Sequence, residues 1–396
     1  MTMTLRNLIH FGGLLLILIL VFPHAQATAI SGVQIFPQDH VWNVPIDDLP
    51  VDARSADYVS TIGATSHLHP DFGAGTWQGS PIGIPYNIVN NTVSKKNVIF
   101  GYADESDRLP YPIPANPLIE GGAACTGDCH ILMVQTDEKK LYELYAAHKL
   151  PNGTWSAGSG AIYDLNGYDL RPDGWTSADA AGLAILPGLV RYEEVAAGEI
   201  THAIRFTAED TQREYIWPAR HYASSITDPR YPPMGQRFRL KASFDTSGYR
   251  PQSKVVLEAL RKYGMLLADN GGNWFISGVP DERWNNDDLN DLKELKGSDF
   301  EAVDESSLMI DPDSGRADVG LQGPIALPGQ SGVPGDPDKD GKYEDLNANG
   351  RKDFADVVLF FEHLDWIVVN EPLPAFDYNA NGRVEFADIV MMFEEL

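Results

Sequence analysis

The sequence contains little cysteine, little positive charge and only one long apolar run. Its 396 residues include two cysteines, and 30 Lys and Arg stand against 56 Asp and Glu, which gives a formal net charge of −26. So acidic a chain lacks the basic stripe that binds phosphates, which excludes nucleic acid as a partner. The sequence has no G-x-S-x-G, H-E-x-x-H or P-loop motif, so it lacks the signatures of α/β-hydrolases, zinc metalloproteases and P-loop nucleotide-binding proteins.

The apolar run stands at the start of the chain. It extends over residues 14–22, after a weakly basic start, and small residues follow at Ala25, Ala27 and Ala29. This order is typical of a cleaved export signal, and the run is short for a membrane span. We therefore predict a signal peptide over residues 1–29, with an uncleaved anchor as the alternative. The mature protein is then secreted, extracellular or attached to the cell surface, with no membrane span.

The two cysteines lie four residues apart, as Cys125 and Cys129 in Cys-Thr-Gly-Asp-Cys. In an oxidising compartment this spacing favours a small-loop disulfide. A structural zinc site would need further Cys or His ligands, and the sequence has no second Cys pair.

Residues 30–318 read as a main domain of the α+β class, β-rich and sandwich or barrel-like. Alternating segments with turn residues between them predict strands, and two of these predict a hairpin. Apolar residues at helical spacing predict three helices, at 55–62, 253–263 and 287–296. The predicted strands are 95–102, the hairpin pair 130–136 and 139–147, 199–207 and 214–217. Gly and Pro then dominate a predicted linker at residues 319–335.

An internal repeat follows the linker. Residues 345–356 and 377–388 align at an offset of 32 and share nine of twelve positions. Loop positions 1, 3, 5, 7, 9 and 12, with glycine at position 6, bring oxygen ligands around one Ca²⁺. The predicted ligands are Asp345, Asn347, Asn349, Arg351, Asp353 and Asp356, and then Asp377, Asn379, Asn381, Arg383, Glu385 and Asp388.

An apolar stripe follows each loop. The stripes consist of Phe354, Val357, Val358, Phe361 and Leu364, and of Phe386, Ile389, Val390, Phe393 and Leu396. We expect two helices that bury these stripes against each other, in a small all-α module at residues 336–396 that calcium stabilises.

This module resembles the dockerin family, in which Asp closes the calcium loop and a helix follows directly. The resemblance covers residues 336–396 only and implies docking to a cohesin-type receptor. Positions 10 and 11, often Ser-Thr in that family, are Phe354-Ala355 and Phe386-Ala387 here, so the receptor's identity stays open. Just upstream, Asp336, Asp338 and Asp340 resemble the acidic calcium repeats of thrombospondin-like stalks. They would hold a third ion or form a solvated acidic run.

The main domain offers several catalytic candidates. His69 and Asp71, with His67, would share one side of an extended strand, as a metal half-site, an acid–base pair or an exposed turn. Asp128 and His130 flank Cys129, with Glu120 nearby, and His221 belongs to an Arg-His-Tyr cluster. The two carboxylates that a glycosidase needs could be among Asp104, Glu105, Asp107, Asp164, Asp169 and Asp179. Tryptophans such as Trp77 would stack on sugar rings, or pack in the core.

Three stretches, 174–183, 217–221 and 268–272, resemble a family of secreted bacterial proteins without an assigned activity. Together these features predict a secreted carbohydrate-active enzyme, a polysaccharide hydrolase rather than a lyase, that carries a calcium-dependent docking module. The alternatives are a non-catalytic carbohydrate-binding or adhesion protein with the same module, and a structural or inhibitor component of an assembly.

Overall fold

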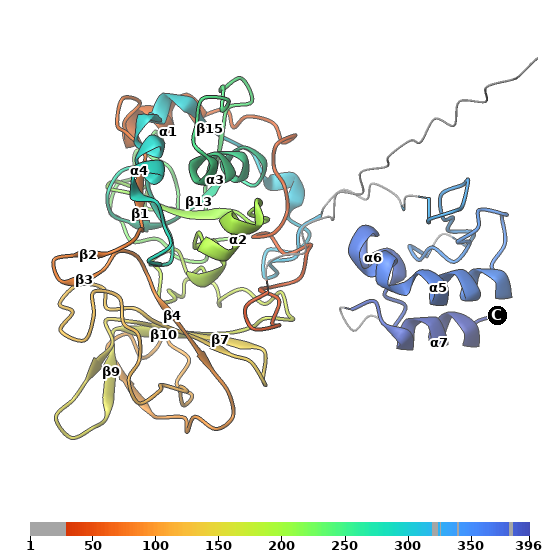
Figure 1. The fold of residues 1–396 in the computed structure, drawn as a ribbon, viewed down its shortest axis with the longest axis horizontal. Coiled ribbons are helices and arrows are strands. Elements are labelled where there is room, and N and C mark those ends of the chain that lie inside the picture. Colours follow the sequence, from red (N-terminus) through yellow and green to blue (C-terminus); the bar gives the residue numbers. More distant parts are fainter. Residues whose placement is uncertain (1–28, 319–323, 325, 339, 380–382) are drawn as a thin grey trace, which may run out of the picture.

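The computed structural model describes residues 29–318, 324, 326–338, 340–379 and 383–396 (Figure 1). All but the last residue of the predicted signal peptide, and part of the predicted linker, lie outside these ranges. Every helix within them is too short or too polar to cross a membrane. The class is mixed α and β with strands dominating, which confirms the coarser part of the fold prediction.

The largest sheet is six-stranded and joins segments from both ends of the main domain. Its order is β1 (His69–Asp71), β14 (Phe275–Ser277), β11 (Ile204–Ala208), β13 (Met265–Asn270), β12 (Arg237–Leu240) and β15 (Phe300–Ala302). β1 runs parallel to β14, and β11 runs parallel to β13, while the remaining pairs are antiparallel. The sheet therefore brings His69–Asp71 beside a strand about two hundred residues later in the chain.

Smaller sheets contain the predicted hairpin. β6 (Ile131–Gln135) and β7 (Lys140–Tyr145) pair antiparallel, which confirms it. They lie between β10 (Ser159–Asp164) and β4 (Tyr86–Val89) in a four-stranded sheet. β5 (Val98–Phe100), β9 (Trp155–Ala157) and β8 (His148–Lys149) form another sheet, and β2 (Thr76–Trp77) pairs with β3 (Ser80–Pro81).

One predicted strand is wrong. Residues 214–217 contribute only an isolated β-bridge between Tyr215 and Met234. The backbone amide of Ile216 also donates a hydrogen bond to the Met234 carbonyl. Pro218 has no N–H to donate to a continuing ladder, so the extended segment ends before a strand forms.

The helices confirm two predictions and correct a third. α1 (Ser55–Ile62) and α3 (Pro251–Lys262) occupy the predicted segments, and Gly264 follows α3 with a positive φ of 68°. A Cβ on Gly264 would lie 2.3 Å from the Phe238 carbonyl oxygen, so only glycine fits there.

The remaining elements of the main domain are α2 (Tyr192–Ala197), η1 (Leu186–Gly188), η3 (Gly297–Asp299) and η4 (Ser306–Leu308).

The predicted helix at 287–296 is instead one α-helical turn, α4 (Asn286–Leu289), followed by the 3₁₀ helix η2 (Asn290–Glu294). Leu289, Leu292 and Leu295 are all buried. Their spacing of three matches the three residues per turn of a 3₁₀ helix better than the 3.6 of an α-helix, which explains the error.

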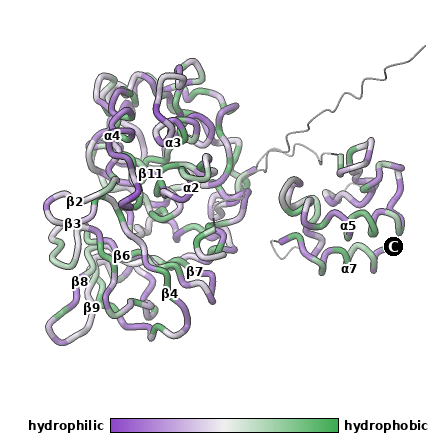
Figure 2. The backbone as a smooth tube through the Cα atoms, viewed as in Figure 1, coloured by the Kyte–Doolittle hydropathy of each residue, from purple (hydrophilic) through white to green (hydrophobic). Residues whose placement is uncertain are grey.

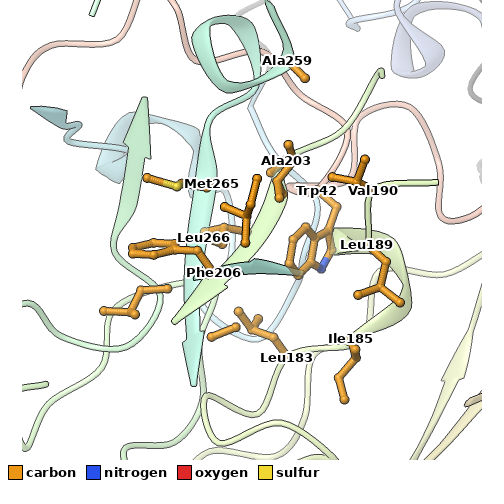
Figure 3. Close-up of a cluster of buried hydrophobic side chains, with 14 of the residues drawn as sticks. Trp42, Leu183, Ile185, Leu189, Val190, Ala203, Phe206, Ala259, Met265 and Leu266 are labelled. Carbon is orange, nitrogen blue, oxygen red and sulfur yellow. The ribbon is translucent and has the colours of Figure 1, made fainter. Parts of the chain in front are cut away.

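The core of the main domain surrounds the central strands of the large sheet. Trp274, Phe206, Phe238 and Phe300 form a chain of ring contacts with centroids 5.4–5.7 Å apart. Trp42, Leu266 and Leu189 join this apolar interior from three further segments (Figure 3). The hydropathy colouring shows the apolar strands inside and polar segments at the periphery (Figure 2). This packed interior makes the sheet a rigid base for the groups at its edge.

The C-terminal residues have a core of their own, which is built on α5 (Phe354–Asn370), α6 (Leu373–Phe376) and α7 (Phe386–Glu394). The predicted stripes are only partly buried. Val357 and Ile389 are buried, whereas Phe354, Phe361, Phe386 and Phe393 are 52–62% exposed. The faces that pack are centred instead on Phe360, Ile367 and Met392. The sequence is apolar around more than one face of each helix, so its periodicity did not single out the inner one.

Candidate functional site

A cleft of about 910 Å³ opens at the β1 edge of the large sheet. Its walls come from four separate parts of the chain. These are β1 with the β2–β3 ribbon, the loop at residues 120–129, the end of β14, and the α4–η2 segment. Three of the predicted catalytic residues, His69, Asp71 and Asp128, line this cleft together with Glu120.

His69 and Asp71 lie on the same side of β1, because Pro70 between them points into the protein. The ring of Phe275 stacks on His69 with centroids 4.1 Å apart, and the His69 amide donates to the Trp274 carbonyl at 2.9 Å. His67 lies outside the strand, with Nδ1 2.6 Å from the Lys293 carbonyl oxygen. The strand therefore presents His69 and Asp71, but not His67, to the cleft.

Asp71 has a raised pKa. It is reached by solvent through the cleft, yet protein surrounds it on the other sides, and this loss of hydration raises the pKa above the ordinary 3.8. The negative charge of Glu120 raises it further, while His69 and Arg205 oppose the change. The protonated form of Asp71 is thereby stabilised relative to that of a fully hydrated aspartate.

Glu120 is the opposite case. Burial works against its ionisation, but the charge and hydrogen bond of His130 outweigh burial and hold the pKa of Glu120 below its ordinary 4.5. His130 Nδ1 lies 2.5 Å from Glu120 Oε2, and Nε2 donates to the Ala178 carbonyl at 3.0 Å. Burial alone would lower the pKa of His130, yet Glu120 raises it to about 9. His130 is therefore an imidazolium that keeps Glu120 ionised.

The loop that carries Glu120 is fastened at several points. A disulfide joins Cys125 to Cys129, with Cα atoms 5.6 Å apart. Ser80 Oγ donates to the Gly121 carbonyl at 2.6 Å, and the Asp128 carbonyl accepts from Ala146 at 2.7 Å. These bonds restrict the loop, and they place Asp128 at the rim of the cleft while His130 lies buried behind Glu120.

A buried charge cluster lies next to these groups. Arg205 donates to both carboxylate oxygens of Asp179 at 2.6 Å, to Ser277 at 2.8 Å and to Asp269 at 3.1 Å. Its positive charge lowers the pKa of both Asp71 and Glu120. Burial and the nearby charge of Asp179 raise the pKa of Asp269 to about 7. Arg205, on β11, is thus held by partners on two other strands and a loop, and it acts on the cleft through its charge.

An aromatic side chain stands at the cleft mouth. Trp77, on β2, lines the cleft and is 70% exposed. Gln78, Asn286 and Lys293 add hydrogen-bonding groups to the same walls. An exposed indole with amide and ammonium groups beside it presents both an apolar ring face and hydrogen-bonding groups to the cleft.

The other predicted candidates lie elsewhere. His221 Nδ1 donates to the Ala180 carbonyl at 2.8 Å, and its Nε2 is 3.9 Å from Glu105. Asp107 forms an ion pair with the buried Arg171, and Asp179 forms one with Arg205. His221 and the predicted carboxylate set of residues 104–179 are therefore separate from the cleft. Glu120 is near Asp128 and His130 in the sequence, but only the folded chain places it in the same cleft as Asp71.

The two repeat loops place their first and last carboxylates in the interior. Asp345, Asp356, Asp377 and Asp388 are each at most 6% exposed. Backbone amides of Asn347 and Asp353 donate to Asp356, at 3.1 and 2.9 Å, and those of Asn379 and Glu385 donate to Asp388, at 3.0 and 2.7 Å. Burial raises the pKa of both position-12 aspartates. The described parts of the two loops thus hold the last aspartate in the same way, while Asn381 lies outside the described residues.

In loop 1, the Asp345 carboxylate accepts from the amides of Asn349 and Gly350 at 2.8 and 2.6 Å. Asn349 donates to Asp353 at 3.3 Å, and Arg351 lies 3.8 Å from Asp353. Asp345 and Asp353 are thus each bonded within loop 1, and calcium binding by the loop stays a prediction.

A second group of acidic residues stands before loop 1. One carboxylate oxygen from each of Asp336, Asp338, Asp340 and Glu344 lies within 4.8 Å of the others. This cluster could hold a metal ion. Glu344 was not among the residues predicted for it.

No family model, curated protein or solved structure matches the chain.

Proposed function

We propose that the main domain hydrolyses a polysaccharide in the cleft lined by Asp71 and Glu120. The observation that carries the proposal is the opposite change in the pKa of two carboxyl groups in one cleft, raised for Asp71 and lowered for Glu120. Glycosidases need this division of labour, because one carboxyl group must donate a proton while the other must stay ionised.

In this mechanism Asp71 donates its proton to the glycosidic oxygen as the bond from that oxygen to the anomeric carbon breaks. Glu120 supplies the negative charge that stabilises the oxocarbenium-like transition state, and it then accepts the proton of the water that bonds to the anomeric carbon. His130 maintains the ionised state of Glu120 through their 2.5 Å contact. Trp77 offers a stacking surface for a neighbouring sugar ring.

The experiment is an assay of reducing ends on a panel of polysaccharides with wild type, Asp71→Asn and Glu120→Gln. We expect each variant to lose about 10²- to 10⁴-fold in kcat, the usual contribution of a general acid or base. Glu209→Gln, which changes an exposed glutamate outside the cleft, serves as the matched control and should retain full activity.

Two outcomes would contradict hydrolysis. Retention of wild type on insoluble glycan without products would favour the non-catalytic carbohydrate-binding alternative. Products that absorb at 235 nm, without an increase in fully saturated reducing ends, would indicate a lyase.

We further propose that residues 336–396 form a calcium-dependent docking module for a cohesin-type receptor, as the dockerin resemblance implies. Two observations support it: the buried carboxylates repeated in both loops, and an exposed aromatic surface on α5 and α7. In this surface Phe354 contacts Phe393 and Phe361 contacts Phe386, with ring centroids 6.1 and 6.2 Å apart. The repeat thus produces a nearly symmetric apolar face beside the ion loops.

Calorimetric titration of the protein with Ca²⁺ tests the module, and immobilised cohesin-type domains test the docking. We expect Asp345→Ala and Asp377→Ala each to remove one bound ion. Phe361→Ser should weaken receptor capture while leaving calcium binding unchanged. Equal capture in calcium and in EDTA would refute calcium-dependent docking.

A further inference from the structure

The acidic turn in front of loop 1 contains an unusual buried carboxylate. Glu344 is 1% exposed, and its Oε2 accepts no hydrogen bond from any described residue. A buried carboxylate oxygen without a partner is costly, because it has lost its water and gained nothing in exchange. The carboxylate of Glu344 is directed at Asp336, Asp338 and Asp340, with all four ligand oxygens within 4.8 Å.

Four carboxylates this close together repel one another strongly unless a cation lies between them. Lys342, which also belongs to the turn, donates through Nζ to the Asp377 carbonyl at 2.5 Å. Calcium binds oxygen at 2.3–2.6 Å, so ligands on opposite sides of one ion stand up to about 5 Å apart. The 4.8 Å spread of the four oxygens is within this limit.

We propose that Asp336, Asp338, Asp340 and Glu344 bind a third Ca²⁺, with Glu344 as the buried ligand that completes the site. The inference deepens the calcium-dependent module proposed above, but it does not depend on loops 1 and 2 being occupied. The sequence pattern contained the three aspartates, and the tertiary structure supplied the fourth ligand.

The position of the turn indicates what this ion does. Gly335 and Asp345 exchange backbone hydrogen bonds of 2.9 and 3.1 Å, which close the turn at its base. Tyr343 donates its amide to the Ala375 carbonyl and accepts from the Tyr378 hydroxyl, both at 3.0 Å. The turn is therefore bonded to the segment that leads into loop 2, and Glu344 directly precedes the first ligand of loop 1. An ion held here stabilises the junction between the two loops.

Native mass spectrometry of the full chain at saturating Ca²⁺ counts the ions directly. We expect three bound ions for wild type and two for Glu344→Gln and for Asp338→Asn. Asp365→Asn, which removes one exposed charge from α5, is the matched control and should keep three. Two ions on wild type, with none lost in Glu344→Gln, would overturn the third site.

The loop variants separate this inference from the proposed module. If wild type binds one ion that only Glu344→Gln removes, the turn site stands and the repeat loops fail. If wild type binds two ions that are lost one at a time in Asp345→Ala and Asp377→Ala, the loops stand and the turn site fails.

Thermal unfolding gives a second readout that a merely structural glutamate would not produce. In EDTA, Glu344→Gln removes one of four carboxyl groups that crowd together, so we expect a higher Tm than wild type. In Ca²⁺ it removes a ligand, so we expect a lower Tm. A change of the same sign in both conditions would contradict metal binding by Glu344.

Discussion

The ion pair between Glu120 and His130 predicts a pH-dependent contribution to stability that Glu120→Gln removes. The pKa of His130 rises from an ordinary 6.5 to about 9 in the folded chain, against the effect of its burial. Each pKa unit is worth about 1.4 kcal/mol, so the folded state gains on the order of 3 kcal/mol from protonating His130. His130 is 2% and Glu120 26% exposed at the side chain, so solvent screens the pair only weakly.

The sign follows from the direction of the change. A histidine whose pKa is raised on folding stabilises the fold fully below pH 6.5, and this stabilisation disappears as the pH rises through about 9. In Glu120→Gln the carboxylate is gone, and burial with the charge of Arg205, opposed by Asp179, lowers the pKa of His130. We therefore expect the destabilisation caused by Glu120→Gln to be about 3 kcal/mol larger at pH 6 than at pH 10.

Urea unfolding at the two pH values measures this difference, and an NMR titration of the His130 imidazole measures the pKa itself. Glu209→Gln should show no pH-dependent difference from wild type. A destabilisation of equal size at both pH values, or a wild-type His130 that titrates near 6.5, would refute the assignment of Glu120 as an ionised carboxylate held by imidazolium.

Three further outcomes follow from the same structure. Activity should decline as the pH falls through the lowered pKa of Glu120 and as it rises through the raised pKa of Asp71. If the decline at alkaline pH persists in the pH–kcat profile of Asp71→Asn, Asp71 is not the general acid. Trp77→Ala should weaken binding to the substrate glycan by about 0.5–1.5 kcal/mol, roughly 2- to 12-fold. Its Tm should be unchanged because the indole is 70% exposed, whereas a large fall in Tm would show that Trp77 is a core residue. Burial raises the pKa of Glu305 from 4.5 to about 8, and the charge of Arg237, 3.6 Å away, opposes this change. Between these two pH values the folded state keeps the proton that the unfolded chain loses, so the stability of wild type should fall as the pH rises from 4.5 to 8. Glu305→Gln should match wild type at pH 5 and exceed it at pH 9, and urea midpoints that fail to diverge would show the carboxyl to be ionised throughout.

Several features were predictable because they depend on neighbours in the sequence. The β6–β7 hairpin follows from alternation on either side of a two-residue polar turn, and α3 follows from apolar spacing and the glycine that ends it. The errors arose where a local pattern permits two structures. Leucines three apart suit a 3₁₀ helix as well as an α-helix, and the helices after the two loops are apolar on more than one face.

The catalytic candidates show a different limit. His69 and Asp71 were recognisable as a pair because alternate residues of a strand share a side. Nothing local distinguished Glu120 from the many other carboxylates of so acidic a chain. Its role emerges only because β1 pairs with β14 and the disulfide-closed loop folds over that edge, which brings distant segments into one cleft.

The amino-acid sequence by itself determined the repeated oxygen-rich loops, the helix behind each loop and the main hairpin, since short-range spacing and backbone preferences suffice for these. Tertiary structure alone decided which carboxyl groups lose their water and which charges face them. The pKa of Asp71, the ionisation of Glu120 and the unpaired oxygen of Glu344 all depend on burial, and burial is a property of the packed chain.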